Sequence, residues 1–196
     1  MRQAEQQMPE DHLRDDDEID AALVHRARNG DDRAFGDLVR RHERRAQQLA
    51  AFVIGSTSEV GDVTQEAFLL AYTRLAKLEG ERAFRPWLMR IVANTAKNRI
   101  RAASRRTRRD QRLHAFAVPP ALTPDEHAVA DADADALWRA LGRLDNRERV
   151  VIALRFAAGM SEAETAAVLG IPAGTVKSRM ARGMATLRST MGATRD

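Results

Sequence analysis

Hydrophobic residues recur with a helical period along most of the chain after its first eighteen residues. Apolar side chains return every three or four positions, a spacing that places them on one face of an α-helix. In the first half of the chain, three such runs cover residues 19–28, 32–52 and 62–78. The breaks between and after them contain Gly30, Gly55 and Gly80. No segment alternates apolar and polar residues as a half-buried strand would, so the pattern predicts an all-α protein.

The helical pattern resumes after Gly80 and stops again before the last third of the chain. Pro86 stands in the sequence Phe-Arg-Pro-Trp, where a proline suits the first turn of a helix, and this helix is predicted to extend to about Arg106. Residues 107–134 contain three prolines and an Ala-Asp alternation, a composition typical of a linker. Four further helices are predicted within residues 135–191.

These breaks predict two small helical domains joined by a flexible linker. Residues 1–18 are rich in Gln, Glu and Asp and contain few apolar residues, so we expect a disordered acidic tail there. The first domain is then assigned to residues 19–106, the linker to 107–134 and the second domain to 135–191.

Capping-box spacing predicts the first residues of three helices. In such a box the first side chain accepts a hydrogen bond from the backbone three residues later, and the later side chain reaches back. The pairs with this spacing are Asp62 with Gln65, Asp145 with Glu148, and Ser161 with Glu164.

The segment "GMSEAETAAVLGIPAGTVKSRM" (159–180) predicts a helix-turn-helix. Gly170 can adopt the left-handed conformation that reverses the chain, and Pro172 prevents the first helix from continuing. The inner face of the second helix is expected at Val176, Met180, Gly183, Met184 and Leu187. Its outer face then carries Gly174, Lys177, Ser178, Ala181, Arg182 and Ala185. Small residues between basic ones favour entry into a DNA major groove, where Lys177 and Arg182 could contact guanine edges or phosphates.

Charge is distributed in blocks, although the net charge is only +4. Residues 1–20 sum to −6, residues 97–112 to +7 and residues 114–136 to −5. A basic block of this kind indicates a polyanionic partner. Arginine outnumbers lysine, with only three lysines among 32 basic residues, which suits bidentate contacts to phosphate or guanine but also fits a bias in genome composition.

Several functional classes are disfavoured by what the sequence lacks. There are no cysteines, which excludes disulfides, thiol catalysis and Cys-ligated zinc. The five histidines have no metal-ligand spacing, and no nucleophile motif or Walker pattern is present. The N-terminus lacks the pattern of a signal peptide, and the longest apolar run, 49–54, is too short to span a bilayer. We therefore expect a cytoplasmic protein that is not an enzyme and requires no cofactor or metal.

Two separate segments resemble the sigma factors of bacterial RNA polymerase. "DVTQEAFLLAYTRL" (62–75) and "FRPWLMRIVANTAKNRIR" (84–101) resemble sigma region 2, and specifically that of the small extracytoplasmic-function group. "LDNRERVVIALRFAAGMSEAETAAVLGIPAGTVKSRMARGMATLR" (144–188) resembles sigma region 4. Their order and the intervening linker match the same two-domain layout.

The resemblance implies a dissociable polymerase subunit that recognises the −10 and −35 promoter elements and promotes DNA melting. The implied partners are the polymerase core, through the coiled coil of its largest subunit and its flap, together with promoter DNA and an anti-sigma protein. The matched positions for binding the coiled coil are Asp62, Gln65, Glu66 and Phe68, with Leu69 as a further apolar neighbour.

DNA contacts are carried over in the same way. For the upstream element, the implied residues are Thr175, Lys177, Ser178, Arg179, Ala181 and Arg182. Among these, Thr175 and Arg179 are assigned to phosphates. For the downstream element, the implied residues are Lys77, Arg85, Arg90, Asn94, Lys97, Asn98 and Arg101. A flipped base requires a pocket and a basic track for the backbone. Trp87 is interpreted as a core residue rather than a stacking platform.

Three other interpretations were weighed. A helix-turn-helix transcriptional regulator without a role as a polymerase subunit would share the second domain, but it should also carry a receiver or ligand domain containing strands. An enzyme would need a constellation of catalytic residues that the sequence lacks. An all-helical scaffold would bind neither core polymerase nor promoter DNA.

Overall fold

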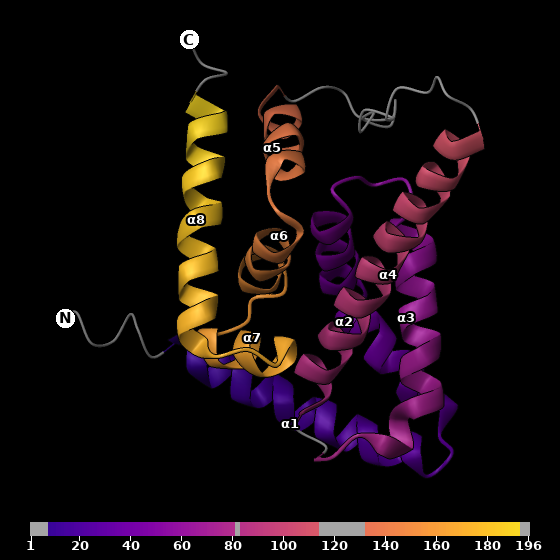
Figure 1. Ribbon diagram of the computed structural model, residues 1–196. Helices are drawn as coiled ribbons and strands as arrows, with labels where there is room; N and C mark the ends of the chain where they lie inside the picture. Colours follow the sequence, from indigo (N-terminus) through magenta and orange to yellow (C-terminus); the bar gives the residue numbers. More distant parts are fainter. Residues whose placement is uncertain (1–7, 81–82, 114–131, 193–196) are drawn as a thin grey trace, which may run out of the picture.

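The computed structural model describes residues 8–80, 83–113 and 132–192, and over these ranges the regular secondary structure is entirely helical (Figure 1). The N-terminal helices are α1 (Met8–Arg28), α2 (Asp32–Ile54), α3 (Val60–Arg74), followed by the short 3₁₀ helix η1 (Leu75–Lys77), and α4 (Phe84–Leu113). The C-terminal helices are α5 (Ala132–Arg143), α6 (Asn146–Ile152), the π-helical turn η3 (Ala153–Ala157), α7 (Glu162–Leu169) and α8 (Ala173–Gly192). The all-α prediction is confirmed.

Helix α1 begins within the stretch that we expected to be a disordered acidic tail. The expectation is wrong for residues 8–18, while residues 1–7 lie outside the described residues. Arg41 on α2 binds Asp16 at 2.7 Å and Asp20 at 2.9 Å, and Asp20 also lies 2.6 Å from His42 Nε2. Burial opposes ionisation of Asp20, but the hydrogen bonds and charges of His42 and Arg41 outweigh it and lower the pKa of this carboxyl group. Cross-helix pairing therefore orders part of the acidic stretch.

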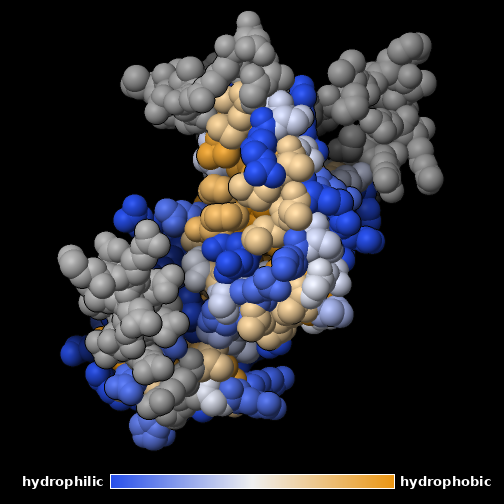
Figure 2. All heavy atoms as spheres, turned by 90° about the vertical axis from the view of Figure 1, so that its left-hand side faces the viewer, coloured by the Kyte–Doolittle hydropathy of each residue, from blue (hydrophilic) through white to orange (hydrophobic). Residues whose placement is uncertain are grey.

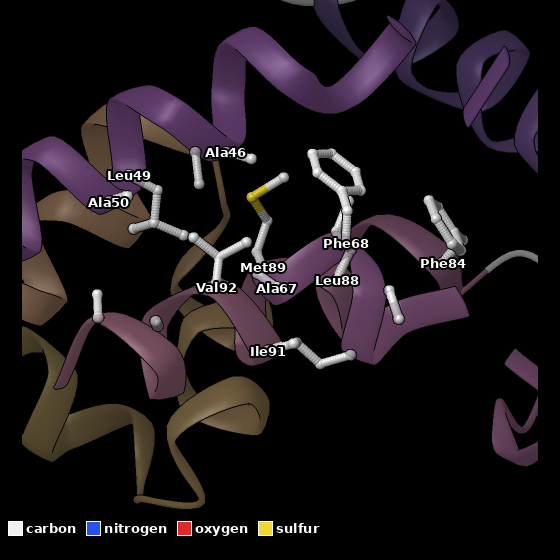
Figure 3. Close-up of a cluster of buried hydrophobic side chains, with 14 of the residues drawn as sticks. Ala46, Leu49, Ala50, Ala67, Phe68, Phe84, Leu88, Met89, Ile91 and Val92 are labelled. Carbon is white, nitrogen blue, oxygen red and sulfur yellow. The ribbon is translucent and has the colours of Figure 1, made fainter. Parts of the chain in front are cut away.

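The N-terminal module is built around α2 and α4. Asp31 caps α2 by accepting a hydrogen bond from the Ala34 backbone, and Gly55 ends α2 in the left-handed conformation at φ 81°. Figure 3 shows Ala46 and Leu49 of α2 facing Met89 and Val92 of α4. Leu49 and Met89 are each 0% exposed, so this contact forms the centre of the core.

Helix α3 begins before Asp62, the residue at which the predicted capping box placed its start. Its first residue is Val60, and Asp62 lies in the first turn, so the predicted pairing of Asp62 with Gln65 is wrong. Glu59 occupies the position before the helix and makes no side-chain cap, because its carboxylate instead accepts a 2.8 Å hydrogen bond from Arg99 on α4. A contact with a neighbouring helix has replaced local capping.

The second module contains the predicted helix-turn-helix together with α5 and α6. Asp145 caps α6 by accepting a 2.6 Å hydrogen bond from the Arg147 backbone. Glu148, the expected reciprocal partner, instead accepts a hydrogen bond from Arg182 on α8. Helices α6 and α8 pass so close that a Cβ on Gly183 would lie 2.6 Å from Ile152 Cδ1. Glycine is therefore required at this crossing unless Ile152 moves.

Helix α4 is longer than predicted. The expected end was near Arg106, whereas the helix extends to Leu113 and α5 begins at Ala132. The expected linker therefore retains helix at both of its ends. Its middle, residues 114–131, lies outside the described residues.

The two modules share one hydrophobic core, which the sequence did not predict. Leu154 and Met160 of the second module belong to the same buried cluster as α2 and α4. Phe52 of α2 meets Trp138 of α5 edge-on, with ring centroids 5.9 Å apart. Figure 1 shows α6 and α7 on the side of the second module that faces α2 and α4. Because this interface contains buried apolar side chains, the structure has a closed arrangement of its two modules.

Candidate nucleic-acid interface

The helix-turn-helix is formed by local capping and one glycine. Ser161 accepts from the Glu164 backbone and the Glu164 carboxylate accepts from the Ser161 backbone, so this predicted capping box is confirmed. Gly170 adopts φ 63°, in the left-handed region, and the Ile171 amide donates to the Ala166 carbonyl oxygen at 3.1 Å. The chain then enters α8 at Ala173. This turn fixes how α8 lies across α7.

The outer face of α8 is exposed as predicted. The exposed side chains there are Lys177, Ser178, Ala181 and Arg182, while Thr175 and Arg179 are half-buried. The inward positions are buried or half-buried, with Val176 at 0% and Leu187 at 8% exposure. Figure 2 views the molecule from the α8 side and shows hydrophilic and apolar residues interspersed on this face. Such a face combines hydrogen-bond donors with room for close approach.

Arg182 already has a partner on this face. Its Nε donates to Glu148 Oε1 at 3.2 Å, and the Arg182 side chain is 64% exposed. Surface pairs of this kind contribute little stability, typically about 0–1 kcal/mol, so the guanidinium can exchange Glu148 for another acceptor.

Most residues predicted for the downstream element lie on an exposed strip of α4. The exposed members of the set are Lys77, Arg90, Asn94, Asn98 and Arg101, and Lys97 is half-buried. Burial, with a smaller effect from the charge of Arg101, lowers the pKa of Lys97. The strip is basic and polar along its length, as a track for a nucleic-acid backbone requires.

Arg85 differs from the rest of this set because it is buried. Its side chain is 6% exposed and Arg85 Nη2 donates to Glu164 Oε1 of α7 at 2.7 Å. Burial alone would raise the pKa of Glu164, but hydrogen bonds from Ser161 and the charges of Arg85 and Arg155 outweigh it and lower the pKa. In the closed arrangement, Arg85 binds the other module and is covered from solvent.

A cavity of about 390 Å³ lies between the start of α4 and helix α7. Its walls include Lys77, Trp87 and Arg90 from the N-terminal module and Ala167 and Val168 from α7. Trp87 is half-buried and its ring centroid lies 6.0 Å from that of Phe84. Trp87 therefore packs on the core as predicted and also lines the cavity. Helix α7 therefore contributes one part of the wall of this pocket.

The predicted polymerase-binding surface on α3 needs one correction. Asp62, Gln65 and Glu66 are exposed, but Phe68 is 8% exposed and belongs to the hydrophobic core. Leu69, at 63% exposure, is the apolar side chain that this helix presents beside the acidic residues. Helical spacing could have identified this difference, because Phe68 lies among the inward positions Thr64, Ala67 and Ala71.

Sequence reasoning also missed residues whose roles depend on the contact between modules. Arg149 of α6 is 8% exposed and donates to the carbonyl oxygens of Leu144 at 3.0 Å and of Ile54 at 3.4 Å. Burial lowers the pKa of Arg149, although the charge of Asp145 opposes this effect. Only its partner on the distant α2 distinguishes Arg149 from an ordinary surface arginine, and the local sequence holds no signal of that contact.

Two features are absent from the described residues. None of the described helices has the length and apolar character needed to cross a bilayer. In the same part of the chain, no three His, Asp or Glu side chains come together in a way that could hold a metal ion.

Both halves of the chain are similar to known protein families. Residues 38–106 match the family "Sigma-70 region 2", and residues 134–187 match the family "Sigma-70, region 4". The "ECF RNA polymerase sigma-E factor" of Escherichia coli (strain K12) is 34% identical over 171 residues, covering 83% of this chain and 89% of that protein. "RNA polymerase sigma factor NccH" of Alcaligenes xylosoxydans xylosoxydans is 35% identical over 182 residues, covering 90% and 96% respectively.

A solved structure has a similar arrangement of the whole fold. In the "Structure of CnrH in complex with the cytosolic domain of CnrY", the matching chain superposes with a TM-score of 0.67 at 32% identity. The match covers 89% of this chain and 98% of that chain. The likeness therefore extends across both modules.

Proposed function

Because the chain belongs to the extracytoplasmic-function group of sigma-70 RNA polymerase sigma factors, we propose that its two modules divide promoter recognition between them. The protein is a transcription initiation factor that binds core polymerase and promoter DNA. The observation that carries the division of labour is the pair of separate basic surfaces, one on α8 and one on α4. In this proposal residues 19–106 form region 2 and residues 135–191 form region 4.

Helix α8 is proposed to read the upstream, −35 element. Its exposed face supports major-groove entry, with Lys177, Ser178, Ala181 and Arg182 toward base edges. Thr175 and Arg179 lie to the side and are assigned to phosphates, which fix position without reading sequence.

Helix α4 is proposed to hold the non-template strand of the −10 element. Arg90, Asn94, Lys97, Asn98 and Arg101 would contact the strand, and the cavity beside Lys77 and Trp87 would receive a flipped base. Binding energy from the open strand would offset the cost of unpairing. For Arg85 to take part, α7 must first move away, because Glu164 holds it in the closed arrangement.

Core polymerase is proposed to bind α3 through Asp62, Gln65, Glu66 and Leu69. An acidic and amide face suits a basic partner helix, and an exposed leucine adds apolar area to the contact. The coiled coil of the largest subunit is the expected partner, with region 4 on the flap. Phe68 is left out because it is buried in the core.

The remaining features of the proposal follow from family membership. The protein is proposed to act in the cytoplasm with RNA polymerase and to have no catalytic activity of its own. A protein inhibitor is also proposed, since CnrH, which is similar over most of the chain, was solved in complex with the cytosolic domain of CnrY. The alternative of a regulator without a polymerase role is disfavoured, because residues 38–106 match sigma region 2.

Run-off transcription with bacterial core polymerase over a promoter library tests this proposal. We expect initiation at a defined subset of promoters that share two sequence elements, and weak promoter binding by the chain alone in gel shifts. Tight, specific promoter binding without core polymerase, or no association with core polymerase in a pull-down, would contradict it.

A further inference from the structure

A second cleft of about 390 Å³ lies between the two modules. Four basic side chains reach it from three helices: Lys97 and Arg101 of α4, Arg147 of α6 and Arg179 of α8. Its apolar lining consists of Val53, Ile100, Val150 and Leu169. The cleft therefore has both basic and apolar lining residues, and both modules contribute to each kind.

Among the described residues that line the cleft, four basic side chains face one carboxylate. Asp145 is the single carboxylate among the described lining residues, and its Oδ1 accepts a hydrogen bond from the Arg147 backbone. Lys97 and Arg101 stand four residues apart on α4, where like charges repel each other. Burial lowers the pKa of Lys97, and the charge of Arg101 lowers it further. Closure of the two modules brings further cations toward this pair, so a bound anion would relieve the repulsion.

We propose that this cleft binds a small oligophosphate, of the class that comprises nucleotide phosphate chains and inorganic polyphosphates. Arginine guanidinium groups match phosphate oxygens with paired, charge-assisted hydrogen bonds. The cleft volume falls within the range of small-molecule sites, roughly 300–1,000 Å³. The apolar lining residues offer a surface for the base of a nucleotide, whereas the cleft is too small for a DNA duplex.

The proposed site shares Lys97, Arg101 and Arg179 with the promoter surfaces, but it exists only when the modules are together. Lys97 and Arg101 are assigned to the downstream strand and Arg179 to phosphates of the upstream element, so DNA would draw these residues to separate places. A small anion would instead bind them at once. Binding that needs both modules favours the closed arrangement by mass action and competes with promoter DNA.

Isothermal titration of the full chain with inorganic tripolyphosphate, at low ionic strength, tests the proposal without polymerase or promoter. We expect saturable binding with one anion per chain, weakly displaced by sulfate at matched ionic strength. Titration with GTP distinguishes the two sources of phosphate. If GTP binds more tightly than tripolyphosphate, the apolar lining residues contact the base. If the two bind equally, the phosphate chain alone is recognised. The absence of saturable binding for both probes would overturn the proposal.

Matched variants identify the cleft as the site. Arg147→Gln removes a charge that has no assigned DNA role and should weaken binding about tenfold, the loss of one charge-assisted contact. Asp145→Asn should tighten binding several-fold, because asparagine preserves the helix cap while the negative charge leaves the cleft. Arg188→Gln removes an exposed charge of α8 that does not line the cleft and should have no effect.

Equal weakening by Arg147→Gln and Arg188→Gln would mean general attraction to a basic surface and would refute the site. Because transcription is not measured, failure here leaves the sigma-factor assignment intact.

Discussion

The two surfaces proposed to contact promoter DNA are presented differently in the closed arrangement. On α8, the side chains assigned to base edges are exposed, and Arg182 has only the partly exposed pair with Glu148. At the start of α4, Arg85 is 6% exposed and bound to Glu164, and α7 lines the adjoining cavity. The proposed surface on α8 is exposed, whereas the proposed surface on α4 is partly covered by the module that carries α8.

The sequence pattern of a helix predicts which of its faces is polar, but it does not predict which other elements cover that face. The outer face of α8 follows from its own spacing, since its neighbours α6 and α7 occupy the apolar side. The cover over Arg85 comes from Glu164, 79 residues away in the sequence. Substitutions in the shared core and on each surface should therefore have separable effects on stability and on DNA binding.

The largest effect is expected for Leu154→Ala, which removes apolar contacts from the shared core. Leu154 is 0% exposed and clusters with residues of α2 and α4, so truncation should cost about 2–5 kcal/mol in the free energy of unfolding. Chemical denaturation measures this loss, and hydrogen exchange should also rise in the last turns of α2. Leu141→Ala is the matched comparison and should raise exchange in α2 less, because the buried residues of its cluster all belong to the second module and α2 meets this cluster through the partly buried Phe52. If both variants leave exchange in α2 unchanged, the modules are not joined by a common core.

Arg182→Ala tests the exposed surface. Loss of a base-edge contact should cost about 1–3 kcal/mol of specific binding and lower transcription from cognate promoters about five- to hundredfold. Stability should hardly change, because the pair with Glu148 is partly exposed. Multi-round transcription with core polymerase measures the effect, and a pull-down checks that core binding is retained. Loss of core binding would show that this face of α8 has been assigned wrongly.

Glu164→Gln tests the covered surface by removing one charge from the contact between modules. Glutamine can still complete the capping box with Ser161, so the change isolates the pair with Arg85 and should cost about 1–2 kcal/mol of interface stability. The isolated variant should then bind a single-stranded oligonucleotide of the downstream element several-fold more tightly, as measured by fluorescence anisotropy. Glu162→Gln removes the same charge from the same helix and should leave this affinity unchanged.

Acid should produce a related effect in the unmodified chain. The pKa of Glu164 is lowered from its ordinary value of 4.5, so its contribution to stability is complete above that value and is lost as the pH falls through the lowered pKa. Hydrogen exchange in α7 should therefore rise in this acidic range, and Glu164→Gln should flatten the dependence. An unchanged pH profile in the variant would assign the acid response to other carboxylates, such as Asp20.

The correct predictions from sequence are those that depend on neighbours within a few residues. Ser161, Glu164 and Gly170 predicted the turn of the helix-turn-helix, because capping and left-handed glycine are local properties. Helical spacing likewise predicted which residues of α8 are exposed. Phe68 was misplaced even though the same spacing was available, because its assignment came from family resemblance rather than from the period of α3.

Other incorrect predictions involve partners far away in the chain. Acidic residues near the N-terminus indicate a solvated tail unless Arg41 and His42 are known to face Asp16 and Asp20. The sequence did not predict that Glu59 would precede the first turn of α3 and bind Arg99, because Arg99 lies 40 residues later. Composition and period carry no information about such pairings, so the closed arrangement and its ion pairs could not be predicted from one sequence.

Arg179→Ala should have the smallest effect and separates positioning from reading within α8. Arg179 is half-buried beside the cleft rather than on the outermost face, so we assign it to a phosphate. Its removal should weaken binding of the polymerase holoenzyme to all promoters alike and reduce the slope of log affinity against log salt by about 1.

Arg182→Ala should instead change the ranking of promoters, because a contact to a base edge depends on sequence. Affinities measured over a salt series, on cognate and mutated −35 elements, distinguish the two roles. A promoter-specific loss for Arg179→Ala would move this side chain to the reading face and would mean that α8 is rotated in the groove relative to our assignment.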